Sequence, residues 1–364
     1  MPAISAASVT AFFSFDVAEA IDLRVLERII GSRTAYAKLQ PKQATPSYVQ
    51  YQEPPVVADG AVLDVAEVDG LRVRLKFYDY GVVSVALTRA FSGTWPELVA
   101  LADELTDNEA IERQATDICH RTFGPFARAF REPHTKLLSE DYLVFTVTAL
   151  ERPVTAEVLL AEHGEAIAQL LRGERERLSD QEKTEILRQR ISYLADDLVV
   201  PTWSSAFVYD NERGAQAILE IFEFANSQLL EFRYYDEWLD LALGRIYAEL
   251  QHPRWHDWIA GRRYTRAAHQ LHSLFIDVNE LTDHTENALK MVGDIYAARV
   301  YTLTTARLGL GYWKESVREK LKTLDDIYRF AIEQRGIARG HLLELTIVLI
   351  LVLELILFFM GIMT

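Results

Sequence analysis

The feature that most constrains this chain is a run near its C-terminus, 345–363, that is apolar almost throughout. It reads LTIVLILVLELILFFMGIM and contains one charged residue, Glu354. As an α-helix it would be about 28 Å long, close to the ~30 Å hydrocarbon core of a bilayer. A single embedded acidic residue costs roughly 2.5–3.5 kcal/mol, which the neighbouring apolar residues together outweigh. The sequence therefore predicts a transmembrane helix over 342–364, the alternative being a helix buried in a soluble oligomer.

Three interpretations of Glu354 stay open. The carboxylate could face a second copy of the chain or another membrane protein, it could be a tolerated charge, or it could line an ion path. Arg335 and Arg339 precede the apolar run and no basic residue follows it, which favours a body that faces the cytoplasm. The N-terminus carries no basic residue before Arg24, so a signal or transit peptide is not expected.

The first part of the chain, 1–150, has the pattern of an α+β domain with a mixed sheet. Apolar and polar residues alternate from Leu71 to Tyr78, as on a strand with one buried face, and Asp69-Gly70 before this run is typical of a tight hairpin. An apolar run at 9–15 predicts another strand. We expect Asp16 to follow it as the N-cap of a helix over 17–30.

Helices dominate the remainder. Residues 151–262 read as a helical region with a short β interval at 191–210, and the near absence of glycine and proline from Gly214 to Pro253 predicts one long helix. Apolar seams with three- and four-residue steps flank the LGLGY turn at 308–312. They predict an antiparallel helical hairpin, or coiled-coil stalk, over 263–341, although two ordinary core-facing helices would give the same pattern.

Charge and composition narrow the functional classes. The formal net charge of −15 and the pI near 5.1 weigh against a nucleic-acid protein, and no direct DNA binding is expected. Arg72, Arg74 and Lys76 nevertheless form a basic stripe along one strand, which could meet RNA or anionic lipid or simply be a solvated face.

No established catalytic signature is present. Phosphate-binding, dinucleotide-binding and serine-hydrolase motifs are missing, and a single cysteine, Cys119, excludes a thiolate metal cage. We therefore expect no cofactor, no metal and no catalytic residue. The strongest polar cluster surrounds the long helix, where Asn226 and Arg233 are seven residues apart and share one side among apolar neighbours. Such a cluster is either a structural hydrogen-bond network or a binding site, and the candidate binding residues are Asp196, Asp197, Asn226, Arg233 and Asp236.

Four segments resemble a known family. They are FYDYGVVS (77–84), ISYLADDLVV (191–200), FANSQLLEFRYYDEWLD (224–240) and LLELTIVLILVLELI (342–356). Together they resemble the required-for-meiotic-nuclear-division family, also known as the YagE family, in order and spacing. The resemblance implies a membrane-associated protein, with mitochondrial members that support translation. Without a transit peptide this chain is more similar to a bacterial member, which implies a single-pass C-terminal anchor in the bacterial cytoplasmic membrane.

These observations lead to two functional hypotheses. The first is a membrane-tethered scaffold that self-associates as a homo-oligomer on the lipid bilayer and presents its α/β domain to a ribosome or another cytosolic protein. The second is an enzyme or small-ligand-binding protein that uses the polar cluster on helix 212–250.

Overall fold

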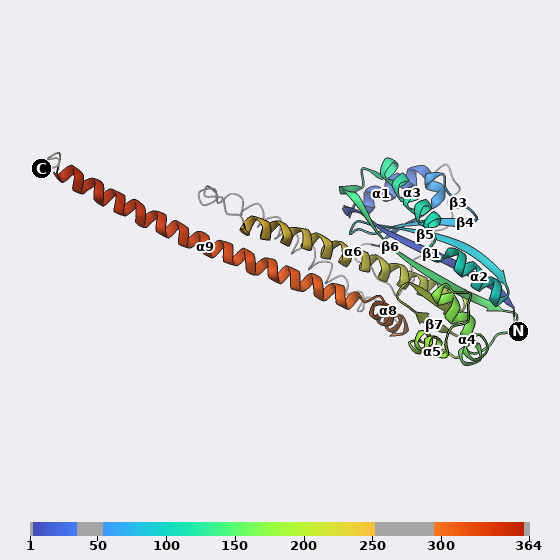
Figure 1. Ribbon diagram of the computed structural model, residues 1–364. Helices are drawn as coiled ribbons and strands as arrows, with labels where there is room; N and C mark the ends of the chain where they lie inside the picture. Colours follow the sequence, from blue (N-terminus) through green and yellow to red (C-terminus); the bar gives the residue numbers. More distant parts are fainter. Residues whose placement is uncertain (1–2, 35–53, 252–294, 360–364) are drawn as a thin grey trace. The chain divides into compact units, whose positions relative to one another are not determined.

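The computed structural model describes residues 3–34, 54–251 and 295–359 (Figure 1). The chain forms two compact units. Unit 1 consists of Met1–Tyr234 with His284–Trp313, and unit 2 of Tyr235–Asp283 with Lys314–Thr364. The domain boundaries expected at 150, 262 and 341 stay predictions.

Unit 1 alternates strands and helices before it ends in helices. In chain order its elements are β1 (Ile4–Ile21), α1 (Leu23–Thr34), β2 (Val56–Asp59), the 3-10 turn η1 (Gly60–Leu63), β3 (Glu67–Val68), β4 (Leu71–Phe77), β5 (Val82–Gly93), α2 (Trp95–Leu105), α3 (Glu109–Phe126), β6 (Phe130–Leu150), α4 (Ala156–Arg172), α5 (Asp180–Arg188), β7 (Leu198–Pro201), β8 (Ser205–Tyr209), α6 (Glu212–Gln251) and α8 (Ile295–Arg307). α6 continues into unit 2, as does α9 (Leu310–Phe359).

The described strands form one mixed sheet in the order β2-β4-β5-β1-β6-β8-β7, with β3 paired to β4. The pairs are antiparallel except β6 with β8, which is parallel. Asp69 and Gly70 both have positive φ, 49° and 77°, which confirms the predicted tight hairpin between β3 and β4. The strands of the 191–210 interval also join this sheet, so it continues past residue 150.

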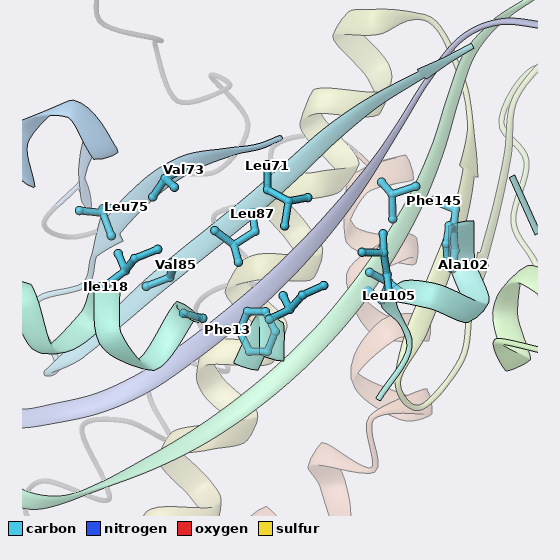
Figure 2. Close-up of a cluster of buried hydrophobic side chains, with 14 of the residues drawn as sticks. Phe13, Leu71, Val73, Leu75, Val85, Leu87, Ala102, Leu105, Ile118 and Phe145 are labelled. Atoms are coloured by element: carbon cyan, nitrogen blue, oxygen red, sulfur yellow. The ribbon is translucent and has the colours of Figure 1, made fainter. Parts of the chain in front are cut away.

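One face of the sheet carries the main hydrophobic core. Alternate residues of the central strands, among them Phe13, Leu75, Val85 and Phe145, point to this face and are buried against α1 to α4. Figure 2 shows this cluster, including Ile118 from α3. These residues share a face because successive side chains on a strand point to opposite faces of the sheet.

Strand β1 is longer than its sequence predicts. Asp16 is not an N-cap but a buried residue within β1, since the backbone of β1 continues to pair with β6 as far as Ile21. α1 begins only at Leu23, and the Asp22 carboxylate accepts a hydrogen bond from the Val25 N–H at 3.0 Å. The capping residue therefore lies six positions later than expected.

α6 covers the opposite face of the sheet and confirms the predicted long helix. It has 40 residues, and every residue from 220 to 232 is buried. The sheet lies on one side, through contacts such as the ring of Phe222 against Tyr142 at 5.5 Å. α8 lies on another side, where Tyr301 contacts Phe224 and donates a hydrogen bond to Gln228. A helix buried on all sides explains why polar and apolar residues mix around its circumference.

In unit 2, α6 and α9 lie side by side. Lys320 Nζ is 2.7 Å from both the Asp236 and the Asp240 carboxylates, and Ser316 Oγ donates to Asp236 at 2.6 Å. From Ser316 to Lys320 along α9, the contacted residues move from Asp236 towards Asp240 along α6. The two segments therefore run parallel. Val317, Leu321 and Leu324 are buried as the predicted seam requires. The seam before the turn, 274–295, lies outside the described residues except for Ile295, which is 81% exposed and does not fit it. A turn at Gly309 (φ 68°) separates α8 from α9.

The C-terminal segment corrects a prediction. α9 ends at Phe359 and contains 342–359 of the expected span, while 360–364 lie outside the described residues. Over the residues described, no helix is both long enough and apolar enough to cross a bilayer. The prediction of a transmembrane helix, and of a single-pass anchor in the cytoplasmic membrane, is therefore wrong.

Candidate functional site

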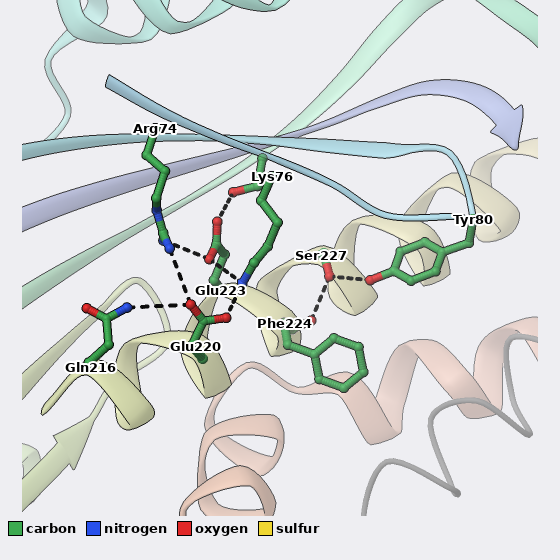
Figure 3. A network of polar contacts seen from close by, with 9 residues as sticks. Arg74, Lys76, Tyr80, Gln216, Glu220, Glu223, Phe224 and Ser227 are labelled. Carbon is green, nitrogen blue, oxygen red and sulfur yellow. Dashed lines mark hydrogen bonds and ion pairs between the residues drawn. The ribbon is translucent and has the colours of Figure 1, made fainter. Parts of the chain in front are cut away.

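The largest buried ionic network of unit 1 lies between β4 and α6. Arg74 and Lys76 are two residues apart on β4, so both point to the α6 face of the sheet. Glu220 and Glu223 are three residues apart on α6, so they lie on one side of the helix and face the two cations. Figure 3 shows the four side chains converging from strand and helix.

The contacts within the network are mutual. Arg74 donates to Glu220 Oε1 at 3.2 Å and to Glu223 Oε2 at 2.9 Å. Lys76 Nζ donates to Glu223 Oε2 at 2.8 Å and also bonds Glu220 Oε2. The hydroxyl of Ser84 on β5 donates a hydrogen bond to Glu223 Oε1 at 2.8 Å. Every carboxylate oxygen of the pair therefore accepts at least one hydrogen bond.

Burial and charge oppose each other at Glu223. Burial alone would raise the pKa of this carboxyl, but the nearby charges of Arg74 and Lys76 and the Ser84 hydrogen bond lower it below its ordinary value. The pKa of Arg74 is raised, since the two carboxylates more than offset the effect of burial. Two cations and two anions thus neutralise one another inside the molecule, where an unpaired charge would be very costly.

This arrangement is suited to holding α6 against the sheet rather than to chemistry. A general acid, base or nucleophile needs a group that can reach a substrate. Here the carboxylate oxygens and the cationic N–H groups of the network already bond to one another. Lys76 and Glu223 are 1% and 0% exposed, so a substrate could not reach them. The basic stripe is therefore mainly internal: Arg74 and Lys76 are paired beneath α6, and only Arg72 is exposed. The expectation of a solvated face is wrong for Arg74 and Lys76.

A second polar cluster lies farther along the same helix. His134 of β6 places Nδ1 3.0 Å from Asp16 Oδ2, and its Nε2 lies 3.3 Å from the Tyr234 hydroxyl. The His134 and Tyr234 rings stack at 4.8 Å. Burial alone would lower the pKa of His134, but the hydrogen bond and charge of Asp16 reverse this and raise it.

Glu231 is the unusual member of this second cluster. It is 3% exposed, and its Oε1 has no hydrogen-bond partner among the described residues. Burial first, and then the charges of Asp16 and Asp79, raise its pKa well above the ordinary value. Burial and the neighbouring negative charges both favour the neutral form of this carboxyl over the charged form.

Two of the candidate binding residues named from the sequence are brought together. Asn226 is fully buried and donates through Nδ2 to Ser14 Oγ and to the Glu140 carbonyl oxygen, both at 3.2 Å. Arg233 forms an ion pair with the Glu140 carboxylate, and its guanidinium lies 5.6 Å from the Trp313 ring centroid. Both residues therefore attach α6 to Glu140 of β6.

The other candidates have separate roles. Asp197 is buried and accepts the backbone N–H groups of Tyr193 and Leu194 at 2.7 and 2.6 Å, so it shapes the turn before β7. Asp196 beside it is exposed. In unit 2, Asp236 pairs with Lys320, and Glu354 is exposed on α9.

Sequence reasoning missed the residues that make the two networks. Glu220, Glu223 and Glu231 all lie on the long helix predicted from the sequence, α6. Their spacings of three and eight residues place them on similar sides of that helix, and this pattern could have identified them. Their partners Lys76 and Asp16 could not be assigned, because pairing between a strand and a helix about 150 or 200 residues away depends on tertiary structure.

Fold and site together define an α+β protein with a mixed sheet, one apolar face, and a second face fastened to a buried helix by neutralised charges. The chain belongs to the family described as "Uncharacterized protein MJ0711, N-terminal domain", whose model matches residues 6–216. The matched region begins in β1 and ends in the first turns of α6, so it contains Arg74 and Lys76 but not Glu220 or Glu223.

One curated relative is an uncharacterized protein, MJ0711, of Methanocaldococcus jannaschii. It is 25% identical over 218 residues, which are 60% of this chain and 65% of the relative. The match thus spans less than two thirds of the relative's length. No solved structure matches the chain.

These comparisons correct the resemblance to the required-for-meiotic-nuclear-division or YagE family. The family match and the archaeal relative both point to the MJ0711 family instead. The expected role beside the ribosome loses the support of that resemblance and stays an untested prediction.

Proposed function

We propose that this protein is a self-associating scaffold, whose copies assemble through the distal part of α9 and display their α+β units to a protein partner. The observation that carries this proposal is the exposure of seven consecutive apolar residues, 347–353. Each of them is between 50% and 61% exposed. Isolated exposed apolar residues are common on proteins, but a continuous run of this size marks an interaction surface.

The size of the surface favours a second copy as the occupant. Seven half-exposed aliphatic residues present on the order of 700 Å² of surface, close to the ~800 Å² that each partner contributes to a standard stable interface. The apolar residues also surround the helix, since seven consecutive positions cover almost two turns. A single neighbour covers only one side, so the proposal predicts a bundle of three or more copies.

The α+β unit supports a display role rather than catalysis. Its most extensive polar network, that of Arg74, Lys76, Glu220 and Glu223, is closed upon itself and has no free group for a substrate. The net charge of −15 favours a basic protein surface as the partner over an acidic one.

The test is the oligomeric state of the full chain. Sedimentation of the wild type over a wide concentration range should show oligomers, and the double variant Leu349→Gln/Val352→Gln should dissociate them. Glu319→Gln, an exposed position of the same helix, serves as the matched control and should leave the oligomer intact. A wild type that stays monomeric, or that binds lipid vesicles without self-association, would overturn the proposal.

A second function, binding of a small ligand beside α6, has one observation in its favour. Glu231 Oε1 is buried without a hydrogen-bond partner in the described part of the chain. A thermal-shift screen of small cationic and amine compounds tests it, with Glu231→Gln as the variant that should lose any response. If no compound shifts the wild type, this second function is excluded for that class of ligand.

A further inference from the structure

Glu231 differs from every other acidic residue on the sheet-facing side of α6 in its surroundings. Glu220 and Glu223 each meet two cations, whereas Glu231 is buried with an Oε1 that has no hydrogen-bond partner among the described residues, and the charges of further acidic groups act on it. The helix is buried on all sides at this point, so solvent cannot screen the carboxyl.

The titratable groups around Glu231 come from several elements. β1 contributes Asp16, the turn between β4 and β5 contributes Asp79, and α6 itself contributes Tyr234. Glu19 of β1 acts on Tyr234 and His134. His134 of β6 lies beside Asp16, with its Nδ1 3.0 Å from Asp16 Oδ2.

We propose that Glu231 is a buried proton-binding site that fastens α6 to the sheet. With the carboxyl protonated, the helix packs against β1 without an added charge. When the proton leaves, a new negative charge stands beside Asp16 and Asp79 in a buried setting, and the helix loosens. α6 belongs covalently to both compact units, so this proton controls how firmly the shared helix is held by unit 1.

The direction in which stability changes with pH follows from the direction of the pKa shift of Glu231. The pKa of Glu231 is raised in the folded state, by burial first and by Asp16 and Asp79 next, above the ordinary 4.5. The stability that it contributes is therefore complete below about pH 4.5 and is lost as the pH rises through the folded-state pKa. His134, whose pKa is also raised above 6.5, acts in the same direction.

Glu223 provides an opposite case two turns earlier on the same helix. Its pKa is lowered, so its contribution is present above 4.5 and is lost on acidification. The two glutamates therefore separate a specific effect of Glu231 from a general effect of pH on α6.

Hydrogen exchange of the full chain tests the proposal. Protection factors of the amides over 224–234 should fall as the pH rises from below 4.5 through the raised pKa of Glu231, by about tenfold for each unit by which that pKa is raised. Glu231→Gln imitates the protonated carboxyl and should keep only the smaller fall that His134 contributes. Glu223→Gln should lower protection throughout while the pH-dependent fall remains.

Two results would overturn the proposal. One is wild-type protection that does not change over this range, and the other is a Glu231→Gln variant that loses protection as the wild type does. Carboxyl NMR of the ¹³C-labelled wild type needs no variant: a Glu231 resonance that titrates near 4.5 would equally exclude a bound proton.

Discussion

Lys76 Nζ lies 2.8 Å from Glu223 Oε2, and both side chains are buried, one near the end of β4 and the other on α6. The pair joins residues 147 positions apart in the chain. Together with Arg74 and Glu220 it fixes the lateral position of α6 on the sheet, because a shift by one residue would leave buried charges without partners.

Removing one member of this network should be severely destabilising. Lys76→Met leaves a surplus buried carboxylate and should lower the free energy of unfolding by about 3–5 kcal/mol, whereas the double variant Lys76→Met/Glu223→Met should cost less than the sum of the two single changes. Chemical denaturation measures both. Arg188→Ala, which breaks an exposed pair with Glu185, is the control and should cost less than about 1 kcal/mol. Additive losses would show that the buried charges are not coupled.

Asn226 and Arg233 should differ in their contribution to stability. Asn226→Ala leaves Ser14 and the Glu140 carbonyl without a partner in a buried place and should cost about 1–3 kcal/mol. Arg233 is 47% exposed, so Arg233→Ala should cost about 1 kcal/mol or less in the same unfolding measurement. If Arg233→Ala proves the more harmful change, its contacts with Glu140 and Trp313 carry more of the fold than their exposure indicates.

Gly81 should be essential for the turn between β4 and β5. Its φ is +97°, and a Cβ atom there would lie 1.8 Å from the Ala18 carbonyl oxygen of β1. Gly81→Ala should therefore lower the thermal midpoint sharply, since neither the turn nor the backbone of β1 can move aside. Gly31→Ala is the matched control, because Gly31 is helical with nothing within 4 Å, and it should raise stability by about 0.5–1 kcal/mol. Equal effects at both positions would contradict this account.

The start of α2 should respond to acid. Glu97 accepts hydrogen bonds from both the backbone N–H and the hydroxyl of Thr94 at 2.8 Å, and the backbone bond in particular lowers the pKa of Glu97 below 4.5. Its contribution is thus present above about pH 4.5 and is lost as the pH falls through the lowered value. Glu97→Gln should reduce stability at neutral pH, and the difference from the wild type should shrink on acidification. Unfolding curves of the wild type and the variant at neutral and at acidic pH measure this difference in stability. A difference that grows in acid would contradict the assigned role of Glu97.

Local patterns in the sequence were sufficient for several elements. The alternation from Leu71 to Tyr78 and the Asp69-Gly70 turn specify the β3–β4 hairpin, because side-chain alternation and positive φ are properties of neighbouring residues. The long helix α6 followed equally from the lack of helix-breaking residues. The same local reasoning failed at Asp16, where pairing with β6 overrides the capping preference of aspartate, and at 345–363, where hydropathy suggested a bilayer-spanning helix that the described residues do not form.

Local sequence patterns specify most of the strands and helices and identify the helix that carries the polar cluster. What those polar groups do depends on the packing of distant segments. The direction in which the pKa of a glutamate on α6 shifts depends on the groups around it: Arg74 and Lys76 lower that of Glu223, while burial and the charge of Asp16 raise that of Glu231. The physical reason is that electrostatic energy in a buried place depends on distances between groups far apart in the chain, which no local pattern contains.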